Sequence, residues 1–361
     1  MAKPLAQTHI VRFLKDPKVA SSLFTAKDWE LLLRQARRTN LLSRIAFLID
    51  KSKLIDQVPE PLGHQLNGAT IIADSNLQSV HREVSKIYAA LSEIKSPFVL
   101  LKGAAYVASR KNTAHGRLFS DVDIMVKKEL LGVSEKALYR HGWITSKIDP
   151  YDQKYYRKWM HELPPMRNLK RRSELDVHHT IIPPTARLKP DVQKIWGASE
   201  PVPDYPGLFV LSPCDMVLHS ATHLFHEGEF HQGLRDLSDL DSLLREHSDN
   251  DPDFWQRLPE RAKELNLSRP LYYGLRYCRI LFDTPIPDQC YQEISVAGAP
   301  SRLGILAMDW LLMKAMTPTC IHHPNRFVGI PNFILYVRSH YLRMPPNLLI
   351  PHLIRKAFKP E

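Results

Sequence analysis

The 361-residue sequence lacks the features that would assign it to a membrane or to the secretory pathway. No apolar run approaches the roughly 18–20 residues that a membrane-spanning helix needs. The first residues, MAKPLAQTHIVRFLKDPK, contain neither the apolar stretch nor the small-residue cleavage site of a signal peptide. The four cysteines form no C-x-x-C pair, and we expect reduced thiols. Together these absences predict a cytoplasmic protein.

The bulk composition is that of an ordinary globular protein, with 44% apolar and 24% charged residues. At roughly 150 residues per domain, the length predicts two domains, or one domain wrapped by helices. The formal net charge of +11 favours an anionic partner such as a nucleotide, a nucleic acid or an acidic surface, without choosing among them. Internal repeats and low-complexity segments are absent from the sequence.

Three regions with different periodicities follow one another along the chain. Residues 1–96 are predicted to be helical, and Thr25 has the position of a capping-box residue. Residues 97–182 are predicted to form an α/β core. Residues 183–361 are predicted to be helical again, with the segment PVPDYPG as a linker. We therefore expect an α+β fold, in which a small mixed β-sheet is flanked by N-terminal and C-terminal helical regions.

The stretch 97–127 organises the predicted core. Its sequence, PFVLLKGAAYVASRKNTAHGRLFSDVDIMVK, predicts a strand, a tight turn, a helix, a loop and a second strand. Asp121 and Asp123 share one face of the second strand, roughly 6–7 Å apart, because side chains alternate along a strand. Two carboxylates held on one face of a buried strand repel each other unless a cation lies between them. Such a pair alone is more often only the polar face of a strand, so the features around it decide whether it is a metal site.

Two features between these strands favour an anion beside the aspartates. Lys102-Gly103 follows an apolar strand and opens a helix, where backbone N–H groups and the helix dipole attract negative charge. Arg117 precedes Asp121 by four residues, which brings its guanidinium within reach of a phosphate held at a metal ion.

A third carboxylate is predicted on a later strand. Polar and apolar residues alternate in the segment 173–178, so Glu174, Asp176 and His178 share one face. If this strand pairs beside the first, Asp176 joins the aspartate pair. Three carboxylates can hold two divalent ions about 3.5–4 Å apart, and all-oxygen ligands suit Mg²⁺.

The ordered motifs LLKGAAY, RLFSDVDIMV and ELDVHH resemble the nucleotidyltransferase superfamily that includes DNA polymerase beta and the aminoglycoside nucleotidyltransferases. Within it, the Lys-Gly turn, the arginine before the aspartate pair and the Asp-Val-His strand are similar to the bacterial branch called uncharacterised nucleotidyltransferases. The resemblance covers about residues 25–345, with specific motifs only in 100–178. It implies two Mg²⁺ ions and transfer of a nucleoside monophosphate from a nucleoside triphosphate such as ATP to a hydroxyl group of an acceptor.

The resemblance also implies roles for individual residues. It makes three aspartates the catalytic metal ligands, namely Asp121, Asp123 and Asp176. It makes a second set the nucleotide-binding residues, namely Lys102, Gly103, Ala104, Arg117 and Ser120. Candidates for contacts with the acceptor or for support of the metal ligands are Glu174, His178, His219, His223, Arg235 and Asp239. In one departure from the superfamily pattern, Ala104 follows the turn glycine where a glycine or a serine often stands.

Two alternatives stay open at this point. A nucleotidyltransferase fold without activity would bind a nucleotide or RNA, as the net charge and Ala104 suggest. A metal-dependent phosphohydrolase would use His219, His223 and His226, which share a helical face, with Asp215 and His231 nearby. The sequence has, however, no His-Asp doublet and no His-Glu-x-x-His. The sequence also leaves open the acceptor (a small molecule, a peptide or a nucleic acid), the preferred base, whether a nucleotidyl or only a phosphoryl group moves, and the oligomeric state.

Overall fold

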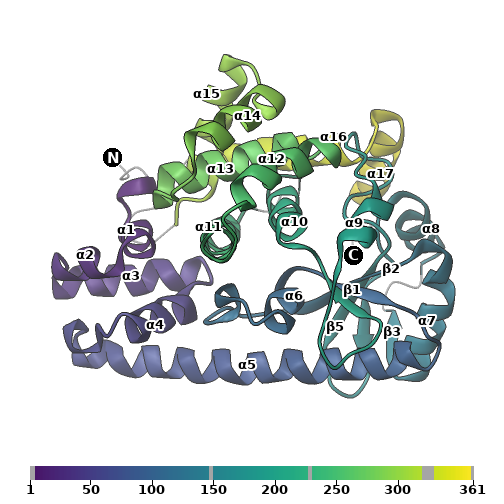
Figure 1. Cartoon of the computed structure of the whole chain (residues 1–361), viewed down its shortest axis with the longest axis horizontal. Coiled ribbons are helices and arrows are strands. Elements are labelled where there is room, and N and C mark those ends of the chain that lie inside the picture. The colour runs from purple at the N-terminus through teal and green to yellow at the C-terminus, as the bar shows by residue number, and fades with distance from the viewer. Residues whose placement is uncertain (1–4, 146–148, 227–229, 319–328, 359–361) are drawn as a thin grey trace.

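A mixed β-sheet of seven strands forms the middle layer of the protein (Figure 1). The computed structural model describes residues 5–145, 149–226, 230–318 and 329–358. The strands lie in the order β3-β4-β5-β2-β1-β7-β6. Their bounds are Phe98–Leu100 (β1), Asp121–Val126 (β2), Trp143–Thr145 (β3), Met166–Asn168 (β4), Glu174–His178 (β5), Glu200–Pro201 (β6) and Leu208–Val210 (β7). The expected α+β fold with a small mixed sheet is confirmed.

The pairing of β2 with its two neighbours sets the geometry at the centre of the sheet. β2 runs antiparallel to β1, with Ile124 opposite Leu100. It runs parallel to β5, with Asp123 opposite Asp176. Val122 is buried, as is Ile124, so the apolar face of β2 packs into the core as the alternation predicts.

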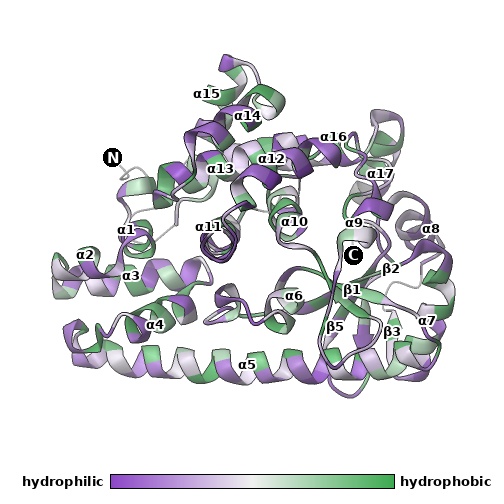
Figure 2. Ribbon diagram, viewed as in Figure 1, coloured by the Kyte–Doolittle hydropathy of each residue, from purple (hydrophilic) through white to green (hydrophobic). Residues whose placement is uncertain are grey.

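The helices before the sheet include one that spans the molecule. Their bounds are His9–Lys15 (α1), Pro17–Ser22 (α2), Ala26–Arg38 (α3), Leu42–Lys51 (α4) and Glu60–Ser92 (α5). Helix α5 has 33 residues, so at 1.5 Å per residue it is about 50 Å long, and it runs below both the other N-terminal helices and the sheet (Figure 1). Hydrophobic and hydrophilic residues alternate along it (Figure 2), and its apolar side chains are buried at Val80, Val84, Ile87 and Leu91.

The remaining helices flank the sheet and form a layer opposite α5. Those beside the strands are Lys102–Ala108 (α6), Leu131–Arg140 (α7), Pro150–Trp159 (α8) and Val192–Ala198 (α9). Those of the upper layer are Pro213–His226 (α10), Gly233–Asn250 (α11), Phe254–Glu264 (α12), Ser268–Phe282 (α13), Asp288–Gly298 (α14), Arg302–Ala315 (α15), Gly329–Arg343 (α16) and Pro346–Phe358 (α17). Helix α10 contacts α6 on one side and α11, α12, α13 and α16 around it, so it joins this layer to the core. Within the described ranges, no helix combines the length and the apolar character needed to cross a membrane.

Two strands flank a segment that the sequence predicts as a linker. β6 and β7 enclose most of PVPDYPG as a hairpin loop, and β7 pairs parallel with β1, with Phe209 opposite Val99. The linker prediction is therefore wrong for this segment. β7 has only three residues, which is too short a run to show the alternation of a strand.

The predicted capping box at the start of α3 is present. Thr25 Oγ1 accepts a hydrogen bond from the Asp28 N–H at 3.4 Å, and the Asp28 carboxylate accepts one from the Thr25 N–H at 2.9 Å. Asp28 Oδ1 also lies 2.8 Å from Nε2 of His9, which links α3 to α1. The Thr25 side chain and backbone, and then His9, lower the pKa of Asp28 to about 2.

We predict that Thr25→Ala lowers the free energy of unfolding by about 1 kcal/mol at pH 7, because one end of the box is lost. The box needs the Asp28 carboxylate, whose contribution is fully present above its unfolded pKa of about 4 and is lost as the pH falls towards 2. The difference between wild type and variant should therefore narrow from pH 4 to pH 2, measured by chemical denaturation.

Thr70→Ala is the matched control. Thr70 is an exposed residue inside α5, and its hydroxyl donates a hydrogen bond to the Leu66 carbonyl of the previous turn. Its replacement should change the stability by less than about 0.5 kcal/mol at any pH in this range. An equal loss in both variants would contradict the capping role.

Candidate active site

Three carboxylates meet on the paired strands β2 and β5. The parallel register places Asp123 opposite Asp176, and Asp121 lies two residues before Asp123 on the same face. Carboxylate oxygens of the three residues lie within 4.8 Å of one another. The predicted juxtaposition of Asp176 with the aspartate pair is therefore confirmed.

Asp123 is the most deeply buried of the three, with a side chain that is 3% exposed. Its Oδ1 lies 2.9 Å from Nζ of Lys102 and 3.0 Å from Nε2 of His178. Burial alone would raise the pKa of Asp123, but the Lys102 ammonium and then His178 outweigh it and hold that pKa well below its usual range. Asp123 is therefore ionised throughout the physiological range.

Asp176 has the opposite behaviour, because the Lys102 charge only partly offsets the effects that raise its pKa. Burial, followed by the charges of Asp123 and Asp121, raises the pKa of Asp176 to about 7. Near neutral pH, the protonated and the ionised forms of this carboxyl group are therefore both populated. A cation among the three carboxylates would favour the ionised form.

Gly103 allows the side chains of Phe119 and Arg117 to pack closely against the backbone at one wall of the site. A Cβ atom at this position would overlap the ring of Phe119 and the guanidinium of Arg117. The guanidinium lies over that ring, with Cζ 4.9 Å from the ring centroid. The backbone of Lys102, just before, is left-handed with φ of 44°. The tight turn that the sequence predicts at Lys102-Gly103 is thus present, and α6 begins within it.

A buried ion-pair network joins this wall to helix α11. Asp239 accepts from Nε of Arg117 at 2.6 Å and from Nη2 of Arg44 at 3.1 Å. The three side chains are at most 11% exposed. Two guanidinium groups share one carboxylate, so the network keeps one positive charge next to the three aspartates.

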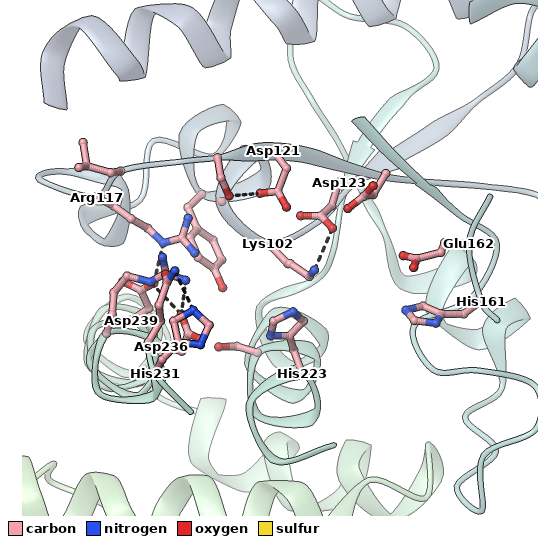
Figure 3. Close-up of a pocket in the computed structure, with 18 of the residues that line it drawn as sticks. Lys102, Arg117, Asp121, Asp123, His161, Glu162, His223, His231, Asp236 and Asp239 are labelled. Atoms are coloured by element: carbon pink, nitrogen blue, oxygen red, sulfur yellow. Dashed lines mark hydrogen bonds and ion pairs between the residues drawn. The ribbon is translucent and has the colours of Figure 1, made fainter. Parts of the chain in front are cut away.

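A polar cavity of about 380 Å³ opens between these elements (Figure 3). Its charged lining residues are Lys102, Arg117, Asp121, Asp123, Glu162, Asp176, Arg235, Asp236, Asp239 and Arg343. Six carboxylates therefore face four cationic side chains, with the histidines counted as neutral. This local excess of negative charge, in a chain whose formal net charge is +11, suits a cation.

Most of the residues predicted for the site line this cavity. They are Lys102, Gly103, Arg117, Ser120, Asp121, Asp123, Asp176, His223, Arg235 and Asp239. The other four do not line it, namely Ala104, Glu174, His178 and His219. The side chain of Ala104 is buried in the core, and Glu174 is exposed. Burial, with Lys102 and His223 nearby, lowers the pKa of His219 to about 3, so this ring is neutral at pH 7.

Several lining residues had no signal in the sequence. Among them are His161, Glu162, Asp236 and Arg343. His161 and Glu162 follow α8 in an irregular segment, and no periodicity marks them. Figure 3 shows these two side chains on one side of Asp123, with Asp236 and Asp239 on the other. Only the folded chain brings them to one cavity.

The histidines of α10 do not assemble the site that a phosphohydrolase would need. Among the described residues, two groups have ligand atoms close enough for a metal ion. Neither contains His219, His223 or His226 of α10, or His231, which follows the helix. Asp215, at the start of the same helix, is held by Arg261 through two hydrogen bonds of 2.7 Å. The structure thus gives no support to a metal site built on α10.

We predict that Asp239→Asn lowers the free energy of unfolding by about 3 kcal/mol, because it leaves two buried guanidinium groups without their counter-charge. Glu30→Gln is the control, since its ion pair with Arg34 is about half exposed and is worth less than about 0.5 kcal/mol. Chemical denaturation measures both. A loss of similar small size in the two variants would mean that Arg44 and Arg117 reach water.

Comparison with known proteins gives one match. No curated protein and no solved structure matches the chain. The model of a family described as uncharacterised nucleotidyltransferases matches residues 25–283, which include the sheet, the three aspartates and helices α10 and α11. The chain belongs to this family of uncharacterised nucleotidyltransferases.

Proposed function

We propose that the protein is a Mg²⁺-dependent nucleotidyltransferase, which transfers a nucleoside monophosphate from a nucleoside triphosphate to a hydroxyl group of an acceptor. The observation that carries the proposal is the group of three carboxylates on paired strands at the wall of a polar cavity. Membership of the nucleotidyltransferase family supports the class of reaction.

Asp121, Asp123 and Asp176 would hold the metal. Their donor atoms are all carboxylate oxygens, which suit Mg²⁺, and the negative charge of the cavity lining suits a divalent cation. When bound, one or two Mg²⁺ ions stabilise the negative charge that develops on the attacking and leaving oxygens.

The triphosphate would bind beside the aspartates. Lys102 and Arg117 supply positive charge from the same wall of the cavity. The backbone N–H group of Gly103, which lines the cavity, belongs to the first turn of α6 and supplies a neutral donor. The hydroxyl of Ser120, at the start of β2, lines the same cavity and donates a hydrogen bond of 3.0 Å to Oδ1 of Asp121.

In the proposed reaction, the acceptor's hydroxyl oxygen forms a bond to the α-phosphorus. The bond from that phosphorus to the oxygen that bridges it to the β-phosphorus breaks, and pyrophosphate leaves with the electron pair. The hydroxyl proton passes to a carboxylate oxygen of Asp176, which lines the cavity.

The acceptor would enter from the side of the C-terminal helices. His223 on α10 and Arg235 on α11 line this side of the cavity and are candidates for contacting it. His178 and His219 are buried behind the lining, so we assign them supporting roles. His178 supports Asp123 through the hydrogen bond between them.

A non-catalytic nucleotide-binding module is the second candidate, and one contact favours it. Nζ of Lys102 lies 2.9 Å from Oδ1 of Asp123, so the ammonium group occupies an oxygen that a metal ion would need. In such a module, a nucleotide would bind through Lys102 and Arg117, and no group would be transferred.

We predict that the full-length protein binds Mg-ATP or Mg-GTP in isothermal titration calorimetry, and that chelation of Mg²⁺ weakens this binding. Asp123→Asn should lower pyrophosphate release by about 10³-fold or more, a loss of about 4 kcal/mol of transition-state stabilisation. Pyrophosphate release is assayed in the presence of mixed hydroxyl-bearing acceptors, including small molecules, peptides and RNA.

Glu129→Gln is the matched control for this experiment. Glu129 is an exposed carboxylate shortly after β2 and lies outside the cavity, so its replacement should change turnover less than about twofold. A folded protein that binds no triphosphate would refute the catalytic proposal. Nucleotide binding that Asp123→Asn leaves intact, with no pyrophosphate release by the wild type, would favour the binding module.

A further inference from the structure

A second group of potential metal ligands lies beside the three carboxylates. His161, Glu162 and His178 each offer one ligand atom, and these atoms lie within 4.8 Å of one another. His161 and Glu162 line the cavity, and Figure 3 shows them next to each other on the far side of Asp123 from Asp236. Two imidazoles and one carboxylate form a ligand set that zinc and related ions prefer, whereas Mg²⁺ prefers oxygen alone.

Backbone hydrogen bonds hold the irregular segment 160–163 against β5. The N–H of Leu163 donates to the Val177 carbonyl, and the N–H of His179 donates to the His161 carbonyl, both at 2.8 Å. Glu162 lies opposite the histidine of β5 in an antiparallel bridge. The three side chains therefore start from paired backbone, and their proximity follows from the fold.

The contacts of His178 indicate that a lone pair of its ring faces a carboxylate. Its Nε2 lies 3.0 Å from Oδ1 of Asp123, which is ionised, so Nε2 carries the hydrogen and donates it. In the neutral ring, Nδ1 then holds a lone pair. This atom is buried, makes no hydrogen bond within the described part of the chain, and lies 3.5 Å from Oε2 of Glu162. Two electron-pair donors that face each other require a proton or a metal ion between them.

The observed distance fits a metal ion between these two atoms. Two ligands that each lie about 2.0–2.1 Å from a tetrahedral zinc ion are about 3.4 Å apart. The separation of 3.5 Å between His178 and Glu162 is close to this value. A proton would satisfy only these two atoms, whereas a metal ion would also use His161, whose ring centroid lies 5.0 Å from that of His178. The hydrogen bond from His178 to Asp123 is the carboxylate–histidine contact that commonly supports a metal-bound imidazole.

We propose that His161, Glu162 and His178 bind a divalent transition-metal ion of the zinc class. Three protein ligands leave the fourth position of a tetrahedral ion open. His161 and Glu162 line the cavity, so the open position faces it and takes a water or an oxygen of a ligand. The site uses donor atoms separate from those of the three aspartates, and it does not rest on nucleotidyl transfer.

The test titrates metal-depleted, full-length protein with Zn²⁺ and with Co²⁺, in the absence of nucleotide. Wild type should bind Zn²⁺ much more tightly than Mg²⁺, and Co²⁺ should show the visible absorption of a site with nitrogen ligands. His161→Gln and Glu162→Gln should each lower the Zn²⁺ affinity at least about tenfold. His231→Gln, which replaces a histidine of the same cavity outside the proposed site, should leave the affinity unchanged. Thermal melting of each variant checks its fold.

Three results would overturn the proposal. One is a folded wild type that binds no Zn²⁺, since a proton then lies between His178 and Glu162. Another is an affinity that both variants leave unchanged. The third is a loss of Zn²⁺ binding in Asp121→Asn alone, which would assign the ion to the three aspartates. X-ray absorption at the zinc edge of the wild type needs no variant, and it should count two imidazole ligands. Because no nucleotide is present, these results are independent of whether the protein transfers nucleotides.

Discussion

The parallel pairing of β2 with β5 in a single register is the interaction on which the site depends. It brings Asp123 opposite Asp176 and keeps Asp121 on the same face. The other face of the two strands is apolar and buried, at Val122, Ile124, Leu175 and Val177. A slip of one residue would turn these side chains towards the cavity and the carboxylates into the core. The hydrophobic effect on one face therefore fixes the chemistry on the other.

Crowded carboxylates impose a balance of charge on the surrounding chain. Lys102 and His178 neutralise Asp123, whereas burial, and then the charges of Asp123 and Asp121, raise the pKa of Asp176 to about 7. In the lining of the same cavity, Arg117 shares Asp239 with Arg44 and keeps a positive charge beside the negative cluster. The negative cluster would attract a metal ion, and the positive charge beside it would attract an anionic ligand.

The layers of the fold bring different chemistry to one cavity. The sheet contributes oxygen donors, the C-terminal helices contribute His223 and Arg235, and the segment after α8 contributes His161 and Glu162. The hydrogen bond between His178 and Asp123 connects the oxygen-rich group to the nitrogen-rich group. An ion in either group would thus act on the other through a single buried contact.

The sequence by itself determined the features that depend on neighbouring residues or on a repeating pattern. The alternation in β2 and β5 indicated which acids share a face, and Thr25 with Asp28 marked the start of α3, because these patterns depend only on residues close in the chain. The sequence did not show whether β2 pairs with β5, because strand pairing joins residues about 50 positions apart. Only the tertiary structure decided that Lys102 reaches Asp123, that Asp239 binds Arg117, and that Glu162 lies beside His178. These contacts depend on packing between distant elements, which leaves no period in the sequence.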